Sequence, residues 1–137
     1  AVWGGMMARI KQTRAEYEAA CRIANMAALQ RVKDAIDLDP CRKWEVADLA
    51  RIATMSRFYF QHQFKARYGM PVRQYAMRSR IELACNLVEG GLPILDVTYG
   101  AGYLSAGTFT TTFKRLIGCP PTQYRIWAAS ASDLGRP

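Results

Sequence analysis

The sequence contains few of the residues from which catalytic and metal sites are built. It has a single histidine, His62, and four widely spaced cysteines that form no Cys-x-x-Cys pair. We therefore expect no zinc site, and we expect reduced thiols of the kind usual in cytoplasmic proteins. Gly-rich phosphate loops, a Gly-x-Ser-x-Gly elbow and a His-Glu-x-x-His motif are also missing. These absences argue against an enzyme and against a bound metal or cofactor.

Long apolar runs and negative charge are scarce as well. No stretch approaches 18 consecutive apolar residues, and no signal-peptide pattern opens the chain, so we expect no membrane partner. The 137 residues include 19 Lys and Arg against 11 Asp and Glu, a formal net charge of +8. Such an excess of positive charge indicates an anionic partner without naming it.

What the sequence does contain is an internal repeat. The segment FKARYGMPVRQY at 64–75 returns as FKRLIGCPPTQY at 113–124, with Phe-Lys, Gly, Pro and Gln-Tyr at the same places. The match continues backward through Ser56 and Ser105, which are 49 positions apart like the segments themselves. Still earlier residues match at 48, which predicts one extra residue in the turn of the second copy. A repeat of this period indicates one supersecondary unit used twice.

Each copy has the helix starts, the turn and the helix end of a helix-turn-helix motif. In the first copy an amphipathic stretch at 44–53 is followed by a two-residue turn, and Ser56 is a good N-cap for a helix over 57–68 that Gly69 ends. In this motif the second helix is shaped for the major groove of DNA. The second copy predicts helices over 94–101 and 106–117, with Ser105 as the N-cap and the whole unit spanning 94–118.

The remaining segments complete an all-α chain. A helix over 71–89 connects the first helix-turn-helix, residues 44–69, to the second, and a short terminal helix covers 121–127. Residues 1–6 are set aside as a scar or the stump of a longer chain. The predicted domains are an extension at 1–27, a DNA-binding domain at 28–128 and a disordered tail at 129–137.

Residues 7–37 predict one long helix or two abutting helices, since they lack proline and glycine. The apolar stripe before residue 28 is weak. This part is either a linker helix or a helix for dimerisation or partner docking, with residues 7–27 as the surface.

The spacing of the two units favours DNA. A recognition helix fits the ~12 Å major groove, and two of them must lie ~34 Å apart to enter successive grooves. The connecting helix spans ~28 Å at ~1.5 Å per residue. A rod slightly short of the helical pitch requires some DNA bending, at a cost of about 1–6 kcal/mol.

Residues 28–127 resemble the AraC/XylS family of bacterial transcription regulators. The motifs that carry the resemblance are VADLA, MS, QFK and YGMPVRQY in the first copy, Arg80 with Ala84, Leu87 and Val88 in the connector, and ILDVTYGAGYLS, FK and GCPPTQYR in the second copy. The resemblance implies a seven-helix double helix-turn-helix domain, here with an N-terminal helical extension. It also implies an activator that contacts RNA polymerase and works in the cytoplasm with the nucleoid.

The family's base-reading residues lie early on each recognition helix. By position these fall on Phe58, Gln61 and His62 in the first copy and on Gly107, Thr108 and Thr111 in the second, and Arg57 can reach a guanine or a phosphate. The expected phosphate contacts are Ser56, Lys65, Ser105, Lys114 and Arg115. Gly107 and Thr111 stand where many relatives carry Gln and Arg, so we expect the first unit to read bases and the second mainly to position the protein.

Two residues could be either internal or in contact with DNA. Phe58 is expected outside the core, because Phe60 already commits the opposite face of the helix. Arg80 is expected to form an internal ion pair with Asp48 or Asp96. The rival to a DNA-binding regulator is a protein-interaction module of the same fold, which docks another regulator and binds DNA weakly itself.

Overall fold

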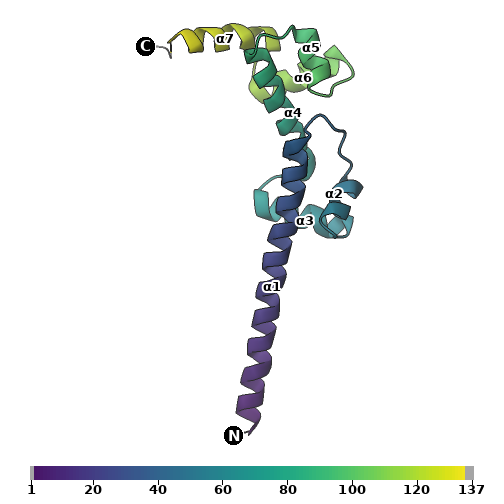
Figure 1. Ribbon diagram of the computed structural model, residues 1–137, viewed down its shortest axis with the longest axis vertical. Coiled ribbons are helices and arrows are strands. Elements are labelled where there is room, and N and C mark those ends of the chain that lie inside the picture. Colours follow the sequence, from purple (N-terminus) through teal and green to yellow (C-terminus); the bar gives the residue numbers. More distant parts are fainter. Residues whose placement is uncertain (1, 135–137) are drawn as a thin grey trace.

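The computed structural model describes residues 2–134, and this part of the chain is helical with short connections and no strand (Figure 1). The helices are α1 Val2–Leu38, α2 Val46–Ile52, α3 Arg57–Tyr68, α4 Val72–Glu89, α5 Ile94–Gly100, α6 Ala106–Ile117 and α7 Pro121–Leu134. The prediction of an all-α chain, with two helix-turn-helix units joined by a connecting helix, is confirmed.

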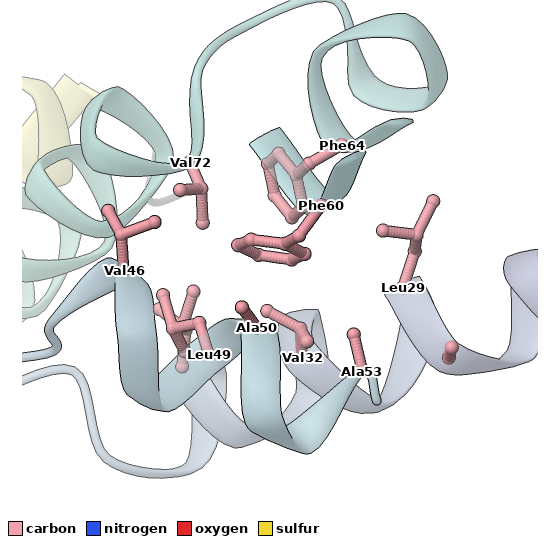
Figure 2. Packing of buried hydrophobic residues seen from close by; sticks show 11 residues of the cluster. Leu29, Val32, Val46, Leu49, Ala50, Ala53, Phe60, Phe64 and Val72 are labelled. Atoms are coloured by element: carbon pink, nitrogen blue, oxygen red, sulfur yellow. The ribbon is translucent and has the colours of Figure 1, made fainter. Parts of the chain in front are cut away.

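The first unit is built around two phenylalanines of α3. Phe60 and Phe64 are fully buried, and their ring centroids lie 5.9 Å apart because residues four apart share one helical face. Figure 2 shows Phe60 lying among side chains from α1 and α2. The buried residues of this cluster are Ala28, Leu29, Val32, Ile36, Val46, Leu49, Ala50, Ala53, Phe60, Phe64 and Val72. The C-terminal part of α1 is therefore the first helix of the unit.

The second unit repeats this construction. Phe109 and Phe113 of α6 are fully buried with centroids 5.7 Å apart, in the places that Phe60 and Phe64 take in the first unit. The buried residues of the second cluster are Ile81, Ala84, Val88, Val97, Ala101, Tyr103, Phe109 and Phe113. Since α4 supplies Val72 to one cluster and Ile81 to the other, it is a structural part of both units.

A tyrosine closes each core in the same way. Tyr75 packs edge-on against Phe64, and its hydroxyl donates to a carboxylate oxygen of Asp37 near the end of α1. Tyr124 makes the same contact with Phe113, and its hydroxyl donates to Glu89 at the end of α4. Burial, and then the bond to the carboxylate, raises the pKa of each tyrosine well above its ordinary value. Both hydroxyls thus remain protonated donors.

The turns inside the two units share a left-handed residue. Thr54 has φ 54° and Gly102, at the equivalent position, has φ 87°. In each turn the next residue donates its N–H back to the preceding helix, Met55 to Ala50 and Tyr103 to Thr98. The second turn reaches its N-cap one residue later, as the change in repeat spacing predicted.

Arg80 joins the two units, but not by the predicted ion pair. Its guanidinium donates to three backbone carbonyls of the loop between α1 and α2, at Pro40 (3.0 Å), Cys41 (3.3 Å) and Arg42 (2.8 Å). The prediction of Asp48 or Asp96 as its partner is wrong, because the loop turns its carbonyls toward α4. These hydrogen bonds support an internal role for Arg80 rather than a DNA contact.

The same loop touches the turn of the second unit. The Cys41 thiol donates to the Gly100 carbonyl at 2.9 Å. A Cβ added at Gly102 would lie 2.5 Å from the Cys41 carbonyl oxygen, so the backbones meet where only glycine fits. The loop therefore forms part of the contact between the two units.

Both ends of the chain differ from expectation. Helix α1 is continuous from Val2, so residues 2–6 belong to it and the alternative of two abutting helices is wrong. Helix α7 continues to Leu134, which makes the predicted end at residue 127 and the disorder at 129–134 wrong; residues 135–137 lie outside the described part.

Helix α2 begins at Val46, two residues later than predicted. Among residues 2–134, no helix is long and apolar enough to cross a membrane.

Candidate nucleic-acid interface

Helix α3 carries the first group of predicted contacts on its outer face. Phe60 and Phe64 commit one side of the helix to the core, so the opposite side faces solvent. The predicted contacts Arg57, Phe58, Gln61, His62 and Lys65 are all exposed. The Ser56 hydroxyl accepts the N–H of Tyr59 at 3.3 Å, and α3 contains no acidic residue. Such a face can approach a polyanion without repulsion.

Phe58 lies outside the core, as predicted. Its side chain is 79 % exposed. Its ring is nearly parallel to that of His62, with centroids 6.0 Å apart and planes 17° apart. The exposed phenyl ring can contact a thymine methyl group, and the imidazole beside it can hydrogen-bond a base edge or a phosphate.

Helix α6 carries the second group of predicted contacts, and its glycine and threonines are shorter than the side chains on α3. Gly107, Thr108, Thr111, Lys114 and Arg115 are exposed, opposite the buried Phe109 and Phe113. The Ser105 hydroxyl accepts the Thr108 N–H at 3.2 Å and donates to the Thr108 hydroxyl at 3.0 Å. An acceptor site of Thr108 is therefore occupied by the cap.

The outer face of α6 differs from that of α3 in two further ways. A Cβ at Gly107 would meet nothing within 4 Å, so this position is open space on the outer face. Arg115 points its guanidinium at the sulfur of Met77 on α4, 3.2 Å away, rather than along α6. The second helix thus offers short hydroxyls and a lysine.

Sequence reasoning missed a third basic surface. A groove of about 370 Å³ between the units is lined by Arg42, Lys43, Trp44, Arg73, Ala76, Met77, Arg80, Tyr103, Thr108 and Thr112. The Arg42 guanidinium lies 4.4 Å from the centre of the Trp44 ring, while Arg80 is held by the loop carbonyls. We call the exposed cations of this groove, Arg42, Lys43 and Arg73, the bridge cations. The Arg-Lys pair at 42–43 was the available signal, but it lies in a loop.

The predicted contacts thus form two groups, one on each recognition helix or its cap, with the bridge cations between the units. Thr108 belongs both to the second group and to the groove wall. Because α4 joins the units and the loop at 39–45 is bonded to both, the three surfaces are parts of one folded body.

Comparison with known proteins gives the family. A family model described as a helix-turn-helix domain matches residues 49–126. A Streptomyces lividans protein described as an AraC-like transcription regulator is 42% identical over 88 residues, which are 64% of this chain and 29% of that protein. The virulence regulon transcriptional activator VirF of Yersinia enterocolitica is 32% identical over 84 residues, 61% of this chain and 31% of that protein. The chain thus matches less than a third of these relatives' length.

Solved structures agree with this assignment. The DNA-binding domain of AdpA, a global transcriptional factor solved in complex with a target DNA, superposes with a TM-score of 0.71 at 26% identity, covering 79% of this chain and 98% of that one. The C-terminal domain of AraT, a response regulator from Geobacillus stearothermophilus, has a TM-score of 0.67 at 25% identity, covering 72% and 83%. These relatives and this fold are those of transcription regulators rather than of enzymes. The chain belongs to the AraC/XylS family of transcriptional regulators and carries its double helix-turn-helix DNA-binding domain.

Proposed function

We propose that the chain binds duplex DNA sequence-specifically by placing α3 and α6 in adjacent major grooves. The outer face of α3 is the observation that carries this proposal. It combines an exposed amide, an exposed aromatic pair and basic residues on a helix without a carboxylate. The AdpA domain, of the same fold, was solved with a target DNA, which supports the same use here.

The first unit is proposed as the base reader. Gln61 can make a bidentate pair with adenine, and Arg57 can do so with guanine, each worth about 1–3 kcal/mol of discrimination. Phe58 and His62 extend the face by one apolar and one polar contact. Ser56 and Lys65, at the two ends of this face, are proposed to hold phosphates.

The second unit is proposed mainly to position the protein. Thr108 has one acceptor site occupied, Gly107 has no side chain, and Thr111 is short. Ser105, Lys114 and Arg115 complete this unit as phosphate contacts, although Arg115 must leave Met77 to reach one. The bridge cations lie between the two grooves, where they can neutralise the intervening backbone.

The test compares a reader with a phosphate contact on the same helix. A duplex enriched by selection and a scrambled duplex are titrated from ~50 to ~200 mM salt. Gln61→Ala should lose about 1–3 kcal/mol on the selected duplex only, with the salt slope unchanged. Lys65→Ala should weaken both duplexes alike and lower the slope by about 1.

Lys11→Ala, on the exposed extension, is the matched control and should change neither quantity. If Gln61→Ala and Arg57→Ala both leave the preference for the selected duplex intact, α3 is not the reader. A steep salt dependence with no enriched sequence would favour the protein-interaction module instead.

The proposed role on DNA is activation through contact with RNA polymerase, in the cytoplasm with the nucleoid. The relative VirF is described as a transcriptional activator, which supports this sign of regulation. In transcription with purified polymerase, the protein should raise transcript from a promoter that carries the selected site. A fall in transcript would identify a repressor.

A further inference from the structure

The groove between the two units is positively charged and has no counter-charge of its own. The lining within residues 2–134 contains no acidic side chain, and its basic residues are Arg42, Lys43, Arg73 and Arg80. Arg80 is already bonded to the carbonyls of the loop at 39–45. The ion pairs found within the same part of the chain do not involve the three bridge cations. Positive charges gathered in this way favour a polyanion as the ligand.

Arg42 is held in place at both its backbone and its side chain. Its carbonyl accepts from Arg80 at 2.8 Å, and its guanidinium lies 4.4 Å from the centre of the Trp44 ring. The indole N–H of Trp44 donates to the Asp39 carbonyl at 2.9 Å, which ties the ring to the same loop. A contact with a ring face consumes none of the N–H donors of the guanidinium. Because Arg42 is exposed and already ordered, it loses little entropy when it binds a ligand.

The geometry of DNA places a minor groove opposite these residues. Major and minor grooves alternate along one face of B-DNA, and the minor groove is ~6 Å wide. When α3 and α6 occupy adjacent major grooves, as the proposed function requires, the surface between them faces the minor groove that separates the two. The groove between the units belongs to this surface, since Thr108 of α6 forms part of its wall.

Bending of the duplex narrows this minor groove. Helix α4 is ~27 Å long, so a duplex with a ~34 Å pitch must bend toward the protein to seat both recognition helices. A bend compresses the groove on its inner side, and arginine side chains enter minor grooves that face inward in this way. Tracts of A·T pairs already have a narrow minor groove, whose enhanced negative potential attracts arginine.

We infer that Arg42 enters the minor groove between the two half-sites and makes the chain select A·T pairs there, at positions that neither recognition helix touches. Lys43 and Arg73 hold the phosphates that border this groove. Arginine suits the narrow groove better than lysine, because a guanidinium is more weakly hydrated than an ammonium group. The inference rests on the proposed function and adds a second kind of sequence preference to it.

Binding titrations of the full chain with three forms of the selected duplex are the measurement. The forms differ only in the base pairs between the half-sites, which are A·T, G·C or inosine·cytosine. Inosine lacks the amino group of guanine, so its pair with cytosine has the minor-groove acceptors of A·T and the O6 and N7 acceptors of G·C in the major groove. The A·T and inosine duplexes should bind roughly tenfold tighter than the G·C duplex, at the low end of DNA deformation energies.

Arg42→Lys is the variant that separates groove reading from charge. It keeps the positive charge and the backbone carbonyl that accepts from Arg80, so the loop should stay folded. It should reduce the preference for A·T over G·C to about twofold or less with the salt slope unchanged, because the ammonium group is harder to desolvate. Lys65→Ala, on α3, is the matched control and should weaken all three duplexes alike.

Equal affinities for the three duplexes would overturn the inference, and so would an Arg42→Lys variant that keeps the full wild-type preference. Similar binding of the inosine and G·C duplexes would place the preference in the major groove instead. A duplex with scrambled half-sites and the A·T centre distinguishes the two failures. If it binds as tightly as the selected duplex, the proposed function fails and the inference with it, whereas selected half-sites preferred whatever the centre overturn the inference alone.

Discussion

Single backbone positions decide how closely the two units meet. Gly69, which ends α3, and Gly102, in the turn of the second unit, both have positive φ, but their surroundings differ. Nothing lies within 4 Å of a Cβ built on Gly69, whereas one on Gly102 collides with the backbone of Cys41. The left-handed conformation is therefore a local feature at Gly69, whereas at Gly102 it lies in the contact between the two units.

This contrast predicts unequal costs for the same substitution. Gly69→Ala should lower the free energy of unfolding by about 1 kcal/mol, from backbone strain alone. Gly102→Ala should cost more than roughly 2 kcal/mol, because the loop at 39–45 must also move. Urea denaturation of the two variants measures both. Equal losses would show that the loop yields freely.

At the scale of elements, α4 does more than connect. Val72 belongs to the first core and Val88 to the second, and from the middle of the helix Arg80 reaches three carbonyls of the α1–α2 loop. Hydrogen bonds to a charged donor are among the stronger ones. The guanidinium therefore ties a loop without regular structure to the element that both units share.

Replacing Arg80 should loosen that attachment. Arg80→Met should lower the free energy of unfolding by about 2 kcal/mol, since the loop carbonyls lose their charged donor. Arg80→Lys should recover part of this loss, because an ammonium can satisfy fewer of the three acceptors. Arg78→Met is the control: Arg78 is exposed and its guanidinium lies 3.8 Å from the uncharged Met70 sulfur, so its loss should stay within about 0.5 kcal/mol. Similar losses for Arg78→Met and Arg80→Met would contradict this role.

At the scale of the whole molecule, the rigid attachment of the two units sets what they can bind. Helix α4 has 18 residues and is ~27 Å long, somewhat short of the ~34 Å pitch of DNA. If α3 and α6 enter adjacent major grooves as proposed, two units on a fixed frame can meet only half-sites at one spacing and on one face of the duplex. Bending the duplex to close the difference costs about 1–6 kcal/mol.

The spacing of half-sites should therefore be strict. Inserting five base pairs, about half a helical turn, between the two halves of a selected site should reduce affinity to that of a duplex with the first half alone. Inserting ten base pairs restores the face but not the distance, and should not rescue binding. Gel-shift titration of the three duplexes tests this, and full affinity after either insertion would mean that the units move independently.

Much of the fold could be predicted because the signals are local. Ser56 and Ser105 cap the recognition helices, Gly69 and Gly118 end them, and phenylalanines four apart set the buried face. The candidate contacts on α3 came from the family resemblance, and they lie on the exposed side of the helix, opposite the buried face. The caps, the helix ends and the buried face depend on spacing along one helix or on the φ preference of one residue, and both are properties of the sequence.

Other features depended on what the chain brings together. The partners of Arg80 are backbone carbonyls, which every residue possesses, so composition pointed to Asp48 and Asp96 while only the folded loop shows the acceptors. The bridge cations come from a loop and from α4, and they share a groove only after the units dock. The sequence by itself determined two helix-turn-helix units and which side of each second helix is exposed. The tertiary structure decided how the units are joined, because that depends on contacts between residues distant along the chain.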